Sequence, residues 1–400
     1  MISRSMSRRA FLRLSAVAGA GAVLAACGTA TDTVAPGAAT AAAPAAAAGA
    51  APTTAATGGM DALIAAAKQE GALTLIALPD DWSNYGAIKK AFGDKYGIKV
   101  NTLNPDGSSQ EEIEAIKANK DNKGPQAPDT IEVGLAFGPS AKKDGLIQPY
   151  KVANWDKIPA DLKDAEGYYY GDYYGVMSFL VNKDVVKNVP TDWADLLKPE
   201  YKGQVALSGD PRGSNQAIQT VYAAALANGG SLDNAQAGLD FFAKLNQAGN
   251  LVPVIAKQAS FAKGETPIQF TWDYLALGAR DALAGNPPAE VVLPKTGLYA
   301  GMYIQAISAY APHPNAAKLW MEYLYSDEGS NLWISGYARP VIFDEMNKRG
   351  AIPQDVLKKL PAPEQYTKAA FPTPEQLDKA KTLITTNWDA VVKADIKKAP

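Results

Sequence analysis

Short apolar runs alternate with amphipathic stretches along the sequence from residue 60 onward. The runs predict strands at 72–78, 98–103, 129–133, 204–208, 267–271 and 290–294. Between them, the segments 85–97 and 109–120 and the stretch 218–225 repeat apolar residues at the spacing of one helix face. Strands that alternate with helices predict an α/β fold, with mainly parallel sheets flanked by helices.

Ligands of such sheets bind at the loops that follow the C-terminal ends of the strands. Five loops have this position: PDDWSNYG (79–86), NPDGSSQ (104–110), GLAFGPS (134–140), SGDPRGSN (208–215) and TWDY (271–274). In two of them a Gly/Ser loop leads from a strand into a helix. Ser108–Ser109 and Ser214–Asn215 begin those helices, so their N–H and hydroxyl groups either cap the helix or meet the oxygens of a ligand. Asp210 and Arg212 add charges that capping does not require.

Aromatic residues mark two of the same loops. Trp82 and Tyr85 directly follow a strand, and they form either a wall of a binding cleft or part of the core. Trp272, Asp273 and Tyr274 repeat this arrangement after a later strand. The tyrosine-rich run at 168–175 is typical of an aromatic crossover segment rather than of an iron site.

Composition narrows the function classes. The chain has 400 residues, with 39 basic and 41 acidic side chains, one histidine and one cysteine. This balance argues against a nucleic-acid partner. His313 is predicted to stand at a helix entry, and no serine-hydrolase, zinc-protease or phosphate-loop motif is present, so we expect no enzyme, no cofactor and no metal site. A hydrolase that uses two carboxylates stays open as a different class, as does a receptor-linked sensor.

The N-terminal residues 1–27 resemble a bacterial lipoprotein signal. Arg8 and Arg9 precede an apolar run in the manner of a twin-arginine signal, and LAAC resembles a lipobox with Cys27 as the lipidated residue. Residues 28–59, composed almost wholly of Ala, Gly, Thr and Pro, predict a disordered tether. We therefore expect a protein that is exported from the cytoplasm and anchored to the membrane through Cys27.

Three further segments carry a family resemblance. The segments 191–216, 128–150 and 312–340, together with Trp-Asp-Tyr at 272–274, resemble extracytoplasmic solute-binding proteins of ABC importers. They are most similar to the spermidine/putrescine binders, with ferric-iron and phosphonate binders as neighbours. The resemblance implies two lobes joined by crossing strands, residues 60–177 plus 303–400 and residues 178–302, which close over a ligand. It also implies a monomer that delivers a small solute to permease subunits.

The resemblance also assigns roles to single residues. Trp82, Ser83 and Tyr85 are similar to a loop that wraps a polyamine, and Trp272 is similar to a stacking tryptophan. Asp210 matches a carboxylate that pairs with an ammonium group, and Tyr337 matches a tyrosine of the cleft. Gly213 and the segment 297–307 depart from the polyamine pattern, because they lack an expected glutamate and a Trp-x-Asp pair. A small anion such as a phosphonate, held by Arg212 and the helix starts, and ferric iron are the alternative ligands.

Overall fold

The structure is a computed structural model that describes residues 53–54, 59–361, 366 and 368–398. The predicted signal (1–27) lies outside the described residues, as does the predicted tether (28–59) apart from Thr53–Thr54 and Gly59. Thr53–Thr54 form β1, which pairs in parallel with β6 (Tyr150–Lys151), and α2 (Gly59–Glu70) begins at Gly59. None of the described helices is long and apolar enough to span a membrane.

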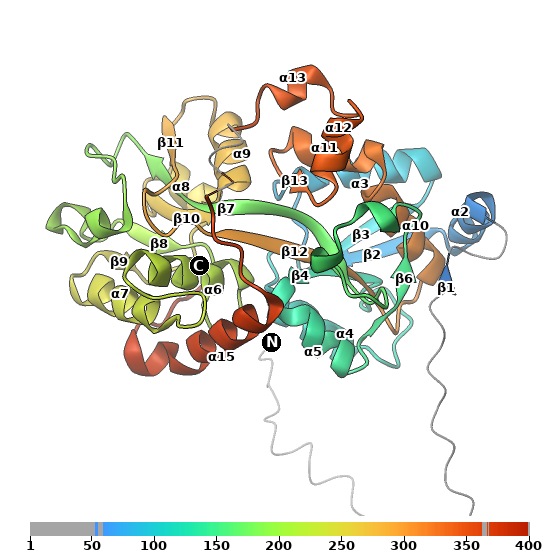
Figure 1. Ribbon diagram of the computed structural model, residues 1–400, viewed down its shortest axis with the longest axis horizontal. Helices are drawn as coiled ribbons and strands as arrows, with labels where there is room; N and C mark the ends of the chain where they lie inside the picture. The colour runs from blue at the N-terminus through green and yellow to red at the C-terminus, as the bar shows by residue number, and fades with distance from the viewer. Residues whose placement is uncertain (1–52, 55–58, 362–365, 367, 399–400) are drawn as a thin grey trace, which may run out of the picture. The chain divides into compact units, whose positions relative to one another are not determined.

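One mixed sheet runs through the middle of the body. Its strands are ordered β4 (Thr130–Gly134), β12 (Ala300–Ser308), β7 (Tyr170–Asn182), β10 (Ile268–Trp272), β8 (Val205–Leu207) and β9 (Leu251–Val252). Three further strands pair with its two long strands: β5 (Ile147–Gln148) with β12, and β11 (Ala289–Val292) and β13 (Arg339–Pro340) with β7. The long strands β7 and β12 run antiparallel and side by side (Figure 1). Parallel pairs are β8 with β9 and with β10, and the separate pair β2 (Ala72–Ile76) and β3 (Lys99–Leu103).

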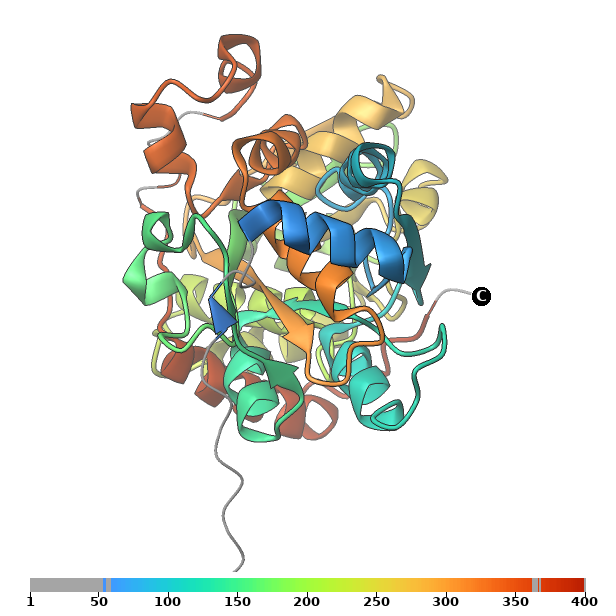
Figure 2. The ribbon, with the colours of Figure 1, turned by 90° about the vertical axis from the view of Figure 1, so that its right-hand side faces the viewer.

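Helices cover these sheets. They are α3 (Tyr85–Tyr96), α4 (Ser109–Ala118), α5 (Gly138–Lys143), α6 (Asn215–Ala227), α7 (Gln236–Gln247), α8 (Gln258–Ala262), α9 (Asp273–Leu283), α10 (Pro314–Leu324), α11 (Asp327–Ser335), α12 (Phe343–Lys348), α13 (Gln354–Leu357) and α15 (Pro374–Val391). Figure 2 shows α2 lying across α10. The predicted α/β class is confirmed, with the difference that the centre of the sheet is antiparallel because β7 and β12 cross it.

The aromatic run predicted as a crossover is the first half of β7, which is buried along nearly its whole length. Its two glycines permit close packing on both faces. A Cβ at Gly171 would lie 2.4 Å from the sulfur of Met302, and one at Gly175 would lie 2.5 Å from the ring of Tyr274. Only glycine leaves room for these contacts, so the spacing of Gly171 and Gly175 sets how β7 meets its neighbours.

The predicted lobe boundaries fall inside the two long strands, at 177/178 in β7 and at 302/303 in β12. Helix α15 belongs to the first predicted lobe, yet it packs on α6 and α7 of the second as well as on the 3₁₀ helix η1 (Leu135–Phe137). The end of the chain therefore contacts elements from both predicted lobes. The residue boundaries of the two lobes stay a prediction.

Candidate functional site

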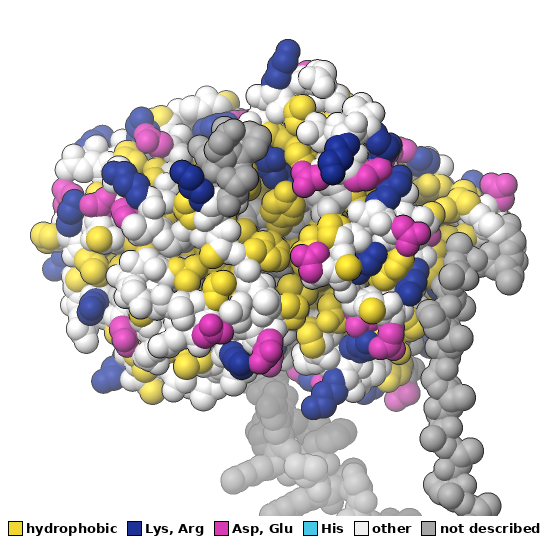
Figure 3. All heavy atoms as spheres, viewed as in Figure 1, with side chains coloured by type: hydrophobic (Ala, Val, Ile, Leu, Met, Phe, Trp, Pro, Cys, Tyr) yellow, Lys and Arg dark blue, Asp and Glu magenta, His cyan; other side chains and the backbone are white. Residues whose placement is uncertain are grey.

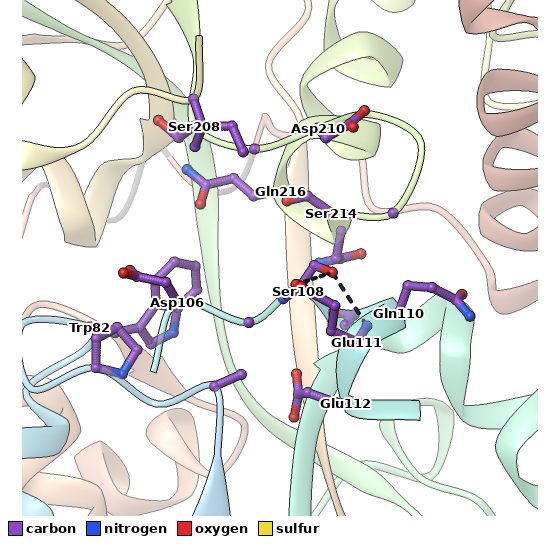
Figure 4. A pocket seen from close by; sticks show the side chains of 18 of the residues that line it. Trp82, Asp106, Ser108, Gln110, Glu111, Glu112, Ser208, Asp210, Ser214 and Gln216 are labelled. Carbon is purple, nitrogen blue, oxygen red and sulfur yellow. Dashed lines mark hydrogen bonds between the residues drawn. The ribbon is translucent and has the colours of Figure 1, made fainter. Parts of the chain in front are cut away.

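A cavity of about 570 Å³ opens where loops from several strand ends meet. Its walls come from the loops after β2 and β3, the first turn of α4, the loop after β8, the first turn of α6 and the last residues of the described chain. Figure 4 shows the two sides facing each other, with Ser208, Asp210, Ser214 and Gln216 across from Trp82, Asp106, Ser108 and Glu112. A space of this size accommodates a small organic solute.

Helix α4 begins at the cavity, and side chains cap its N-terminus there. Ser108 Oγ accepts a hydrogen bond from Glu111 N–H at 3.3 Å, and Ser108 N–H donates to the Glu111 carboxylate at 2.7 Å. Together these two hydrogen bonds form a capping box, so Ser108 caps the helix as one of its two expected roles. Ser109 Oγ accepts from Gly134 N–H at 3.2 Å and so links α4 to β4. Both serines line the cavity.

The floor of the cavity carries two buried carboxylates. Glu112 is 2 % exposed and accepts a hydrogen bond from Glu132 N–H at 2.9 Å, and Glu132 is 3 % exposed. The Glu132 carboxylate accepts from the hydroxyls of Tyr85 and Tyr173, at 2.7 Å each. Neither acid lies within 4 Å of a Lys, Arg or His nitrogen of the described chain. These two side chains therefore place uncompensated acidic groups beside the cavity.

Burial dominates the titration of this floor. It raises the pKa of Glu112 well above the ordinary value, and the hydrogen bond from Glu132 N–H only partly opposes this shift. Burial likewise raises the pKa of Glu132, against the hydrogen bonds from its tyrosine partners. The neighbouring Asp172, 0 % exposed, has a pKa raised well above the ordinary value by burial and by repulsion from Glu132. A cation that reached the floor would favour the ionised form of these groups.

The cations on the cavity wall are all paired with acids of the described chain. Lys257 Nζ lies 2.5 Å from Asp106, and Lys398 Nζ lies 3.0 Å from Glu111. Arg212 lies 2.8 Å from Asp210 and also contacts two acids near the end of the chain. Over the surface drawn in Figure 3, Lys and Arg side chains are likewise interspersed with Asp and Glu. No cation that lines the cavity is therefore left without an acidic partner in the described chain.

The opposite wall is the start of α6. Ser214 is the N-cap residue of this helix but makes no side-chain cap hydrogen bond. Asn215 lines the cavity, is 2 % exposed, and its Nδ2 has no hydrogen-bond partner among the described residues. Gln216 Nε2 donates to Thr271 Oγ1 at 2.9 Å, which ties α6 to β10. Asn215 thus has a buried amide donor without a partner among the described residues.

An aromatic cluster stands behind the cavity. Trp82 and Tyr303 line the cavity and pack edge to face with ring centroids 5.5 Å apart. Trp272 and Tyr274 lie behind them, fully buried and stacked on each other at 6.4 Å. Trp272 packs on the backbone of β12, where a Cβ at Gly301 would lie 2.2 Å from the indole ring. Among the predicted aromatic residues, Trp82 therefore borders the cavity, whereas Trp272 and Tyr274 support its wall.

The other predicted residues lie away from the cavity. Ser83 and Tyr85 are buried beneath the loop, at 3 % and 0 % exposed. The Asp273 carboxylate is occupied by the N–H of Val176 at 2.8 Å and by the hydroxyl of Tyr366. The Tyr337 hydroxyl donates to Asp281 on α9. The predicted residues that do line the cavity are Trp82, Ser108, Ser109, Asp210, Arg212, Ser214 and Asn215.

The two acids of the floor are not among the predicted site residues, although each has a signal in the sequence. Glu132 is an acid inside the apolar strand DTIEV, and Glu112 shares a helix face with Ile116. A charged residue at a buried position is uncommon unless it is paired or functional. Four other lining residues that were not predicted reach the cavity from distant parts of the chain, namely Tyr303, Lys257, Ile396 and Lys398. Among the described residues, no three His, Cys, Asp or Glu side chains gather as metal ligands.

More than half of the chain matches one protein family. Residues 130–367 match the model of the bacterial extracellular solute-binding protein family, and the chain belongs to this family. It is a solute-binding component of an ABC transporter, which binds a small solute outside the cytoplasm and pairs with permease subunits, and it is not an enzyme.

Individual relatives agree with this assignment. An uncharacterized protein of Haemophilus influenzae is 33 % identical over 264 residues, covering 62 % of this chain and 71 % of that protein. The spermidine/putrescine-binding periplasmic protein of Escherichia coli is 28 % identical over 262 residues, covering 61 % and 71 %. A solved periplasmic binding protein of Actinobacillus pleuropneumoniae with fructose-6-phosphate bound has a TM-score of 0.65 at 20 % identity, covering 81 % of this chain and 99 % of that one. The two-lobed α/β fold of periplasmic binding proteins is therefore the fold of this chain.

Proposed function

We propose that this solute-binding protein captures a small organic cation, a polyamine such as putrescine or spermidine, and delivers it to the permease. The cation would occupy the cavity between the loops after β2 and β3 and the loop after β8. Its ammonium group would lie against Glu112 and Glu132, and its methylene chain would lie along Trp82 and Tyr303. The E. coli relative, whose name includes spermidine and putrescine, supports this ligand class.

The observation that carries the proposal is the pair of buried acids on the cavity floor. Glu112 and Glu132 are buried without a Lys, Arg or His partner within 4 Å among the described residues, whereas the cations that line the cavity are each paired. A buried ionised carboxylate is costly unless it is compensated. A bound ammonium would supply the missing charge and a charge-assisted hydrogen bond. Trp82 and Tyr303 would contribute cation–π attraction.

A small anion such as a phosphonate is the second candidate, because two helices begin at the cavity. The starts of α4 and α6 bring N–H groups and partial positive charge to the wall, and Asn215 Nδ2 adds a free donor. The acidic floor would repel the same anion, and Arg212 is already bound to carboxylates. Ferric iron is the third candidate ligand, and it rests on the family resemblance alone.

Calorimetric titration with a matched set of ligands tests the proposal. Putrescine should bind, whereas 1,4-butanediol, which has the same chain without the charges, and 2-aminoethylphosphonate should bind far more weakly. The Glu132→Gln variant should lose roughly 10- to 100-fold in putrescine affinity, as expected for a lost hydrogen bond to a charged group of about 1.5–3 kcal/mol. Glu114→Gln, an exposed change on α4, is the control. Equal binding of the diamine and the diol would reject the cation, and binding of the phosphonate alone would favour the anion.

We further propose that Cys27 carries a lipid and that the chain is exported by the twin-arginine route and acts as a monomer. The lipobox-like LAAC sequence supports the lipid on Cys27, and the paired Arg8 and Arg9 support the export route. Mass spectrometry of the N-terminal peptide from the membrane fraction should detect a diacylglyceryl group on Cys27. The Cys27→Ser variant should move to the soluble fraction, and an unmodified Cys27 in the wild-type protein would contradict the anchor.

A further inference from the structure

Arg212 stands at the cavity wall but is held by three carboxylates. Its Nε–H donates to Asp210 at 2.9 Å, its Nη2 lies 2.9 Å from Asp395, and its Nη1 lies 3.4 Å from Asp389. The backbone carbonyl of Ile396 accepts a further hydrogen bond from Nη2 at 3.3 Å. The hydrogen bonds to Asp210 are the main cause of a raised pKa of Arg212, so the guanidinium stays charged. We call Arg212 and its three acids the Arg212 cluster.

Two of the three acids come from the end of the chain. Asp389 lies on α15 and Asp395 lies in the segment 392–398, which we call the C-terminal tail. Both follow the region matched by the family model, which ends at residue 367. Part of the charge around Arg212 thus comes from residues outside the segment that matches the family.

The tail is fastened to the body on both sides of the cavity. Trp388 Nε1–H donates to the carbonyl of Ala394 at 2.7 Å, and Ile255 N–H donates to the carbonyl of Lys397 at 2.8 Å. At the far end, Lys398 Nζ reaches Glu111 on α4 at 3.0 Å. Ile396 and Lys398 therefore line the cavity, and the tail runs from the α6 side to the α4 side of it.

The Arg212 cluster has a net negative charge in consequence. One guanidinium meets three carboxylates, and the nearest added cation, Lys397, lies 3.4 Å from Asp395. With Asp210 alone, Arg212 would form a neutral pair in which Nε and Nη2 face that acid, Nη2 at 2.8 Å. Nη1 and the second N–H of Nη2 would then be free to bind a phosphate or phosphonate bidentately. With Asp389 and Asp395 in place, those N–H groups are occupied. The two acids add two negative charges beside the cavity wall, and Lys397 offsets one of them.

We propose that Asp389 and Asp395 determine the charge selectivity of this cleft, by occupying the outer N–H groups of Arg212 and so denying them to an anionic ligand. This inference rests on the proposed cation-binding function. The ligands excluded are phosphates, phosphonates and carboxylates, while protonated amines are favoured. The residues act through Arg212 and through the field at the cavity and are positioning residues rather than direct ligands.

The double variant Asp389→Asn/Asp395→Asn tests this, with calorimetry and inorganic phosphate, 2-aminoethylphosphonate and putrescine as probes. We expect phosphate and phosphonate affinity to rise at least tenfold over wild type and putrescine affinity to fall several-fold. Low salt enlarges the effect, because about 0.01 M salt screens only beyond roughly 30 Å. The control is Glu375→Gln/Asp378→Asn, which removes two exposed acids from the same helix away from Arg212 and should change neither affinity.

A triple variant identifies the route. Adding Arg212→Gln to the double variant should abolish the gain in phosphate affinity, because the freed guanidinium is what binds the anion. The single variants Asp389→Asn and Asp395→Asn, each checked by thermal denaturation, serve if the double variant is poorly folded. Unchanged phosphate affinity in folded single and double variants would overturn the inference. Failure of wild type to bind putrescine would instead reject the proposed function, and a phosphate gain in the double variant would still support the role of the tail.

Discussion

Glu112→Gln should make the empty protein more stable near neutral pH. Glu112 is 2 % exposed, its pKa is raised well above the ordinary value by burial, and no Lys, Arg or His nitrogen lies within 4 Å of it in the described chain. Glutamine keeps an oxygen that can accept the hydrogen bond from Glu132 N–H, and its amide group can face the cavity. The substitution therefore removes the buried charge while it retains the shape.

The magnitude follows from the pKa of a carboxyl group. The pKa of Glu112 in the folded protein lies above its value in the unfolded chain, so protonation of Glu112 stabilises the folded state. This contribution is fully present below the unfolded pKa of about 4.3, and it is lost as the pH rises toward the raised pKa. At about 1.36 kcal/mol per pH unit, the destabilisation at pH 7 reaches at most roughly 3.7 kcal/mol. We expect the variant to exceed wild type by about 1–3 kcal/mol at pH 7, and the difference to vanish near pH 4.

Urea denaturation of both proteins between pH 4 and 8, without ligand, measures this difference. Glu114→Gln, an exposed change on the same helix, should stay within about 0.5 kcal/mol of wild type at every pH. The same Glu112→Gln protein should bind putrescine at least tenfold more weakly. A variant that is less stable than wild type at pH 7, or a difference that does not change with pH, would show that the buried Glu112 carboxyl does not destabilise the empty protein.

Three further predictions concern the wall and the floor of the cavity. Trp272→Ala should lower the free energy of unfolding by about 3–5 kcal/mol, since this indole is fully buried on β12; an unchanged melting temperature with a large loss of affinity would instead make it a direct ligand. Trp82→Ala, at a residue that lines the cavity, should cost about 1–3 kcal/mol of putrescine binding measured by calorimetry, and unchanged binding would remove Trp82 from the site. Putrescine affinity should rise from pH 5 to 8, because burial raises the pKa of Glu112 and Glu132 and the cation favours their ionised forms. Calorimetry in buffers of different ionisation enthalpy should therefore show protons released on binding, and proton uptake would contradict this.

Local periodicity is enough to predict most of the elements. The expected strands at 72–78, 98–103 and 129–133 correspond to β2, β3 and β4, and the expected helix at 109–120 corresponds to α4. Each depends on residues close in sequence, and burial of one face fixes its period. Ser108 and Ser214 were predicted from the rule that ligands bind at strand ends, and both line the same cavity.

The site depends on long-range contacts that periodicity does not contain. Trp272 ends β10 just as Trp82 follows β2, yet pairing with β7 and packing on Gly301 turn its ring into the core. The acidity of the floor requires that α4 lie against β4, which brings Glu112 to Glu132 across 20 residues. Arg212 meets Asp395 across 183 residues, so no local signal could show that its charge is already compensated.

A crystal structure of the protein with putrescine would show whether the buried acids hold the ligand. We expect a diamine in the cavity, with one nitrogen within about 3 Å of the carboxylates of Glu112 and Glu132 and with its carbon chain along Trp82. A diamine bound elsewhere, or a cavity whose floor stays without a cation at saturating ligand, would contradict it.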